Sequence, residues 1–197
     1  MTIPVAPDSP LPRRFTAGDL RLMLESGILR EDERIELLDG ELVERAAKGF
    51  AHDVVKNALM RRLVPALPDT IYLGIESTLQ LRPNLLLEPD LLLAPVSARS
   101  ASPEGFCTIP GSEILLVIEV AASSPAYDRG RKAALYARHG VRGAGILGDR
   151  RAGADGERPS RTGVRGYRDV AELPRDAILR PRADGLAALS VALAALG

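Results

Sequence analysis

Acidic residues interrupt two of the most apolar stretches of the chain. Glu119 is the only charge between residues 114 and 121, and Asp90 lies between the leucine triplets 85–87 and 91–93. A carboxylate among leucine and valine side chains is costly to bury unless a cation meets it. These two acids are therefore the first candidates for chemistry.

One explanation of these acids is a shared metal ion. If Asp90 and Glu119 lie on neighbouring strands and face the same way, their carboxylates and the backbone carbonyl of Val120 offer the oxygen ligands that Mg²⁺ (or Mn²⁺) prefers. The plainer alternative is that Asp90 reaches water at a strand end and that Glu119 pairs with an arginine. Their occurrence together in two leucine-rich strands favours the metal.

Lys132 adds a basic group to this set. The chain has three lysines against many arginines, and a predicted helix over residues 129–139 places Lys132 on the same side as Leu135 and Tyr136. From there its amine could orient a water molecule or stabilise charge that develops on a phosphate. The alternative is an ordinary ion pair one helical turn away, with Asp128.

The elements that must position these groups follow from local patterns. Thr16 and Asp19 form a capping-box pattern at the start of a helix, and Asp39-Gly40 between two alternating runs predicts a hairpin. Apolar periodicity predicts a helix over residues 49–64. Strands are predicted over residues 71–75, 78–81, 85–93, 114–121 and 144–147, with a loop over 95–112 and a helix-prone end over 186–196.

These elements form one predicted domain over residues 15–197, of mixed α/β class, with a central mixed β-sheet flanked by helices. Residues 1–14 contain four prolines and are expected to form a flexible arm. Residues 148–166 are rich in Gly, Arg and Asp without periodicity, which is typical of a flexible insertion.

Composition excludes several classes of protein. Lys plus Arg and Asp plus Glu both total 26, so no basic coat surrounds the molecule, and phosphates could be held only by a local patch near residues 56–62 or 129–142. The single cysteine, Cys107, rules out an internal disulfide and suits a reducing cytosol. No signal peptide or membrane span is visible, so we expect a cytoplasmic protein.

Several motifs together resemble a known family. Glu88-Pro89-Asp90, residues 116–132 and residues 134–141 closely resemble the Uma-two family, and the hairpin at 35–43 with the following His52 resembles its front end. Members of this family are restriction-endonuclease-like proteins of the PD-(D/E)XK nuclease superfamily. The resemblance implies a restriction-endonuclease-like core and a magnesium-dependent endonuclease, with DNA the expected substrate and a homodimer a further expectation by analogy.

The resemblance also implies roles for residues. Asp90 and Glu119 would be metal ligands, Lys132 the catalytic lysine displaced onto the next helix, and Glu36 a further acid of the site. Alternatively, Glu36 is a solvent-facing strand residue opposite an arginine.

Substrate contacts are expected from His52, Tyr136 and Arg129. For His52 the competing interpretation is a helix cap or a packing residue.

The sequence departs from the family pattern in two places. The first is Ala122, which replaces an acid after the Glu-Val-Ala triplet. The second is the region 143–166, where residues 143–149 replace an aromatic-rich strand end and residues 150–166 replace a hairpin. These departures favour a second hypothesis, a catalytically inactive domain that binds nucleic acid or a protein partner on the same scaffold. A third is an accessory protein with no nucleic-acid role. A Ser-His-Asp hydrolase is disfavoured, because the chain has two histidines and no Gly-x-Ser-x-Gly sequence.

Overall fold

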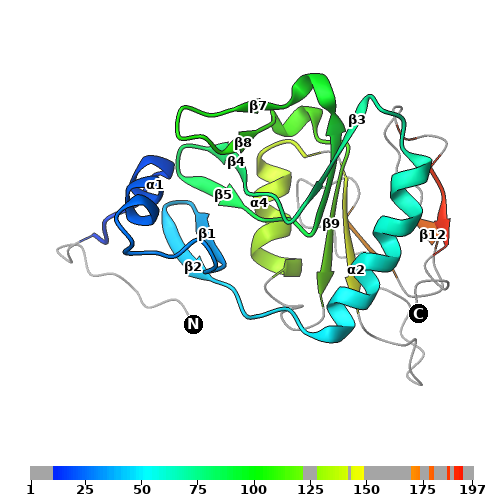
Figure 1. Cartoon of the computed structure of the whole chain (residues 1–197), viewed down its shortest axis with the longest axis horizontal. Coiled ribbons are helices and arrows are strands. Elements are labelled where there is room, and N and C mark those ends of the chain that lie inside the picture. Colours follow the sequence, from blue (N-terminus) through cyan, green and yellow to red (C-terminus); the bar gives the residue numbers. More distant parts are fainter. Residues whose placement is uncertain are drawn as a thin grey trace.

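A five-stranded mixed sheet separates two helices in the computed structural model of the chain (Figure 1). The structure describes residues 11–121, 128–141, 143–148, 170–173, 178–179, 186 and 189–192. The sheet has the order β11-β10-β9-β6-β3. Its strands are β3 (Ile71–Ile75), β6 (Leu91–Pro95), β9 (Leu116–Ala121), β10 (Ala144–Gly148) and β11 (Val170–Leu173).

Strands β9, β10 and β11 run parallel, whereas β6 runs antiparallel to both β9 and β3. The predicted fold class, a mixed sheet flanked by helices, is confirmed.

Helices α2 (Phe50–Leu63) and α4 (Ala133–Arg138) cover opposite faces of this sheet. Because strand residues alternate between faces, Leu91 and Ile118 join the core under α2, while Leu92 and Val117 join the core under α4. The end of the sheet where β6 begins and β9 ends is thereby held between two apolar layers.

A second, six-stranded sheet lies beside the first and has the order β2-β1-β5-β4-β8-β7. Its strands are β1 (Ile35–Leu38), β2 (Glu41–Glu44), β4 (Leu79–Arg82), β5 (Leu85–Leu87), β7 (Ser100–Ala101) and β8 (Cys107–Thr108). Helix α1 (Ala17–Glu25) packs Ala17 and Leu20 against Leu37 of β1 and Leu86 of β5.

The local signals for α1, the hairpin and α2 are confirmed. Thr16 caps α1 through a complete capping box with Asp19. Asp39 and Gly40 both have positive φ, 53° and 85°, as a two-residue turn between β1 and β2 requires. Helix α2 begins after Gly49 and ends before Pro65.

The prediction of one strand over residues 85–93 is wrong. The chain leaves the six-stranded sheet at Leu87 and enters the five-stranded sheet at Leu91. Pro89, which has no amide proton to donate to a strand ladder, lies in the break. Asp90 therefore lies at a crossing between two sheets rather than within one strand.

Other boundaries differ less. Residues 95–112 contain two short strands and the turns η2 (Val96–Ala98) and η3 (Gly111–Glu113). The predicted 129–139 helix consists of the π-helical turn η4 (Asp128–Lys132) followed by α4. No described helix is both long and apolar enough to cross a bilayer.

Near the C-terminal end, the helix prediction is wrong at residues 191–192. These residues form β13 (Val191–Ala192), which pairs with β12 (Ile178–Leu179). Elsewhere, the short turn η1 (Val64–Ala66) follows α2. The proposed arm lies outside the described residues up to position 10. The proposed insertion lies outside them from position 149 onwards.

Candidate active site

Asp90 is almost fully buried, with 1% of its surface exposed, and nitrogen donors lie against both of its carboxylate oxygens. Its Oδ1 atom lies 2.7 Å from Lys48 Nζ and 3.0 Å from His52 Nε2. Its Oδ2 atom accepts a hydrogen bond of 2.7 Å from the backbone N–H of Val120. The carboxylate is thus held from three segments: the stretch before α2, the first turn of α2, and β9.

Glu76 completes this group, which we call the Asp90 cluster (Lys48, His52, Lys56, Glu76 and Asp90). Glu76 directly follows β3 and has a φ of 48°, which is unusual for a residue other than glycine. Its carboxylate contacts both Lys48 and Lys56. His52, Glu76 and Asp90 each offer one ligand atom, and these atoms lie within 4.8 Å of one another. The Asp90 cluster therefore has the donor types of a divalent-metal site.

Lys132 is the centre of a second group, which we call the Lys132 cluster (Glu36, Arg45, Glu119, Lys132 and Tyr136). Its Nζ atom is completely buried and lies 2.6 Å from Glu119 Oε1 and 2.9 Å from Glu36 Oε1. The Tyr136 hydroxyl donates a 2.8 Å hydrogen bond to Glu119 Oε1. Arg45 Nη1 lies 3.5 Å from Glu36 and 3.8 Å from Glu119.

Charge pairing governs the ionisation of both clusters. Burial alone would raise the pKa of Asp90, but His52, Lys48 and the Val120 amide outweigh it and hold that pKa well below its usual value. Burial would likewise lower the pKa of Lys132, yet the carboxylates of Glu119 and Glu36 raise it. Asp90 is therefore a carboxylate and Lys132 an ammonium at neutral pH.

The two clusters adjoin at one end of the five-stranded sheet. The Glu36 carboxylate accepts a 2.8 Å hydrogen bond from the backbone N–H of Glu88, two residues before Asp90. Strand β6 pairs Leu91 with Ile118, so one further step along the ladder brings the Asp90 backbone opposite Glu119. The residues that follow β2 supply a cation to each cluster: Arg45 to the Lys132 cluster and Lys48 to the Asp90 cluster.

The structure divides the sequence-predicted residues between the two clusters. Glu36, Glu119, Lys132 and Tyr136 contact one another in the Lys132 cluster. Asp90 and His52 meet in the other, where Val120 contributes its amide N–H to Asp90.

A single ion shared by Asp90 and Glu119, with the Val120 carbonyl, stays a prediction. The side chain of Arg129 and the whole of Ala122 lie outside the described part of the chain.

Sequence reasoning missed Arg45, Lys48 and Glu76, and it assigned Lys56 to a phosphate-binding patch rather than to this site. A signal was available for two of them, because lysine is rare in this chain and all three lysines lie in the two clusters. No local pattern identifies Glu76, which reaches the site only because the turn after β3 brings it against Asp90; its backbone N–H donates to the Asp90 carbonyl at 3.2 Å.

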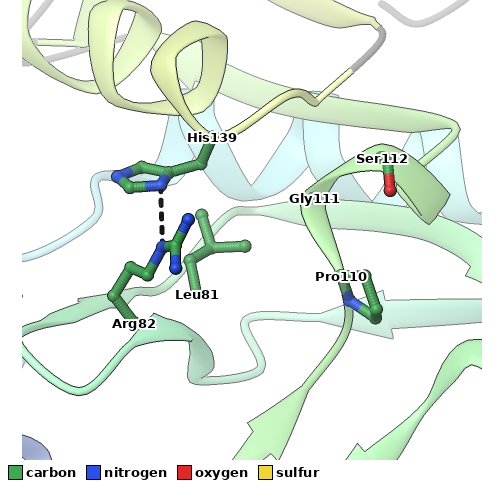
Figure 2. Close-up of a pocket in the computed structure, with 6 residues that line it drawn as sticks. All are labelled: Leu81, Arg82, Pro110, Gly111, Ser112 and His139. Carbon is green, nitrogen blue, oxygen red and sulfur yellow. Dashed lines mark hydrogen bonds between the residues drawn. The ribbon is translucent and has the colours of Figure 1, made fainter.

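A separate pocket of about 330 Å³ lies near the end of α4 (Figure 2). Its lining residues are Leu81, Arg82, Pro110, Gly111, Ser112 and His139. Arg82 Nε donates a long, 3.4 Å hydrogen bond to His139 Nδ1 across it. Among the described residues that line this pocket there is no carboxylate and none of the residues predicted for the site.

Comparison with known proteins assigns the class of this fold. It is similar to a crystal structure from Anabaena variabilis described as "a putative nuclease belonging to DUF820", with 13% sequence identity, a TM-score of 0.56, and coverage of 92% of this chain and 97% of that one. The family model of Uma2, described as "putative restriction endonuclease", matches residues 20–183. The chain belongs to the Uma2 family. A search of curated proteins gave no match.

Proposed function

We propose that this protein is a metal-dependent endonuclease that hydrolyses phosphodiester bonds in DNA. The observation that carries this proposal is the convergence of buried acids and amines from separate strands and helices at one end of a sheet. Membership of a family described as restriction endonucleases supports the hydrolytic activity and the choice of DNA. A homodimer remains part of the proposal by analogy with restriction-like nucleases that pair to cut the two strands of a duplex.

Asp90 and Glu119 are the proposed metal ligands. A bound Mg²⁺ or Mn²⁺ would polarise a phosphoryl oxygen and lower the pKa of a water molecule. The imidazole of His52 and the carboxylate of Glu76 are close enough to Asp90 to bind one ion with it, and a mixed nitrogen and oxygen set suits Mn²⁺ better than Mg²⁺.

Lys132, Glu36 and Tyr136 are best assigned to positioning. Because Lys132 is completely buried between two carboxylates, it fixes the orientation of Glu119. The Tyr136 hydroxyl is also directed at Glu119, and His52 at Asp90. These contacts favour a role for Tyr136 and His52 in orienting the two acids rather than in binding substrate. A phosphate contact by Arg129 stays a prediction.

The alternative function is a catalytically inactive nucleic-acid- or partner-binding domain. One observation favours it: Glu36, Glu76, Asp90 and Glu119 are each already in contact with a lysine. An inactive scaffold could keep such pairs for stability alone.

A nuclease assay separates the two functions. The wild type and Asp90→Ala are incubated with supercoiled plasmid, single-stranded DNA and RNA in Mg²⁺, in Mn²⁺ and in a chelator. Asp69→Ala, at an exposed acid away from both clusters, is the matched control. We expect metal-dependent cleavage of DNA that Asp90→Ala reduces by on the order of a hundredfold or more, with the control unchanged. Equal cleavage by Asp90→Ala would exclude the proposal, and no cleavage by the wild type on any substrate would favour the inactive domain.

A further inference from the structure

Lys48 places its ammonium between two of the candidate metal ligands. Its Nζ atom lies 2.7 Å from Asp90 Oδ1 and 2.5 Å from Glu76 Oε1. One carboxylate oxygen from each of these two acids and one ring nitrogen of His52 are close enough together to share one ion. The lysine therefore lies where a cation bound to these residues would lie.

The buried oxygen at this position is poorly satisfied. Lys48 and His52 are the side chains in contact with Asp90 Oδ1, at 2.7 and 3.0 Å, and neither contact has the alignment of a strong hydrogen bond. A buried carboxylate oxygen without a hydrogen bond is unfavourable. The ammonium neutralises the charge of the carboxylate. A metal ion in its place would do the same and would bind this oxygen directly.

Charge balance opposes a metal ion while Lys48 stays. Near Asp90 the carboxylates of Asp53, Glu76 and Glu88 are met by Lys48, Lys56 and Arg34, so three positive charges face four carboxylates and a divalent ion added beside Lys48 would give an excess of positive charge. A divalent ion added beside the ammonium would face close positive charge in a partly buried site.

Lys48 is better able to leave than Lys132. It belongs to residues 45–49, which have no regular secondary structure, and 12% of its side chain is exposed. Lys132 lies at the end of η4 and is fully enclosed by Glu36 and Glu119. A rotation of the Lys48 side chain towards solvent needs no change in a helix or strand.

We propose that Lys48 is an internal counter-ion of the metal site, which a divalent cation displaces when it binds Asp90, Glu76 and His52. The inference rests on the metal site of the proposed function but adds Glu76 and His52 as ligands and Lys48 as the competing cation. The displaced ammonium would point to solvent next to the ion, where it can contact a phosphate of the substrate.

The test is binding of Mn²⁺, without nucleic acid, measured by titration calorimetry on the wild type, Lys48→Met and Lys56→Met. Both variants remove one positive charge that contacts Glu76, but only Lys48 contacts Asp90. We expect Lys48→Met to bind Mn²⁺ with a Kd lower by on the order of tenfold or more, and Lys56→Met to differ much less. Lys48→Arg, which keeps the charge, should not bind more tightly than the wild type.

Glu76→Gln in the Lys48→Met background should abolish the gain, because it removes a ligand. If Lys48→Met is unfolded without metal, Mn²⁺ should fold it, which circular dichroism would detect; a variant that stays unfolded at high Mn²⁺ would contradict the proposal. Equal Mn²⁺ affinity in Lys48→Met and Lys56→Met would overturn it even if the wild type cleaves DNA. Tighter binding in a protein without nuclease activity would instead support the counter-ion and exclude only the proposed function.

Discussion

Lys132 has no exposed surface, and its charge is balanced by two carboxylates that are themselves buried. Lys132→Met would leave Glu36 and Glu119 facing each other without the ammonium, and the loss of one partner of a buried pair costs about 3–5 kcal/mol of stability. We expect a loss of this size in urea denaturation at neutral pH. Lys56→Met, whose side chain is 11% exposed, is the comparison and should lose less. A loss below about 1 kcal/mol for Lys132→Met would show that the ion pairs contribute little.

Asp90 gives the molecule a pH dependence with a defined sign. Its pKa in the folded state is below its ordinary value of 3.8, so its contribution to stability is present above that value and is lost as the pH falls through the folded-state pKa. Denaturation of the wild type and Asp90→Asn from neutral to acidic pH should show a wild-type advantage that is constant at neutral pH and shrinks below pH 3.8. An advantage that does not change with pH would mean that the carboxylate is not stabilised by Lys48 and His52.

The β1–β2 hairpin is the element that brings Glu36 and Arg45 into the site, and its turn depends on Gly40. The residue has a φ of 85°, and an added Cβ would lie 2.7 Å from the Cβ of Arg14. Gly40→Ala should therefore cost about 1–2 kcal/mol for the left-handed backbone alone, as measured by thermal or urea unfolding. Gly130→Ala is the control, because its Cβ would enter open space. Equal stability of the two variants would contradict this account of the turn.

The elements were predictable where a local signal suffices. The capping box at Thr16, the Asp39-Gly40 turn and the apolar stripe of α2 depend on residues within one or two turns of one another. The passage of residues 85–93 between two sheets was not predictable, because both leucine triplets are equally apolar and the choice of sheet depends on partners far along the chain.

The site was predictable only in part for the same reason. Asp90, Glu119 and Lys132 stand out because a charge among apolar residues is unusual. Neither Lys48 nor Glu76 interrupts a long apolar run of the sequence, and they meet Asp90 only through the packing of β3 and α2 beside β6. The division of the acids into two clusters likewise depends on tertiary contacts, because Asp90 meets groups before and within α2 whereas Glu119 meets groups of η4 and α4.

The whole molecule has no net charge, and several arginines that could hold DNA are already paired. Arg131 contacts Glu41 at 2.5 Å, and Arg138 contacts Asp39 at 3.1 Å. We therefore expect DNA affinity to fall only moderately with salt, with a log–log slope of about −3 or shallower for three or fewer neutralised phosphates. Fluorescence anisotropy with a labelled duplex in a chelator measures this slope. A slope of about −6 or steeper would indicate a much larger basic surface.

The central claim is that the Asp90 and Lys132 clusters act as one metal-dependent active centre. The most direct measurement is the rate of Mn²⁺-dependent plasmid nicking by Asp90→Ala, Glu119→Gln and the double variant. Residues that act as a unit have strongly non-additive effects, so we predict that each single change lowers the rate by on the order of a hundredfold or more and that the double variant is hardly slower than either. The claim would be contradicted if the rate loss of the double variant equalled the product of the two single losses, or if one of the single variants kept full activity.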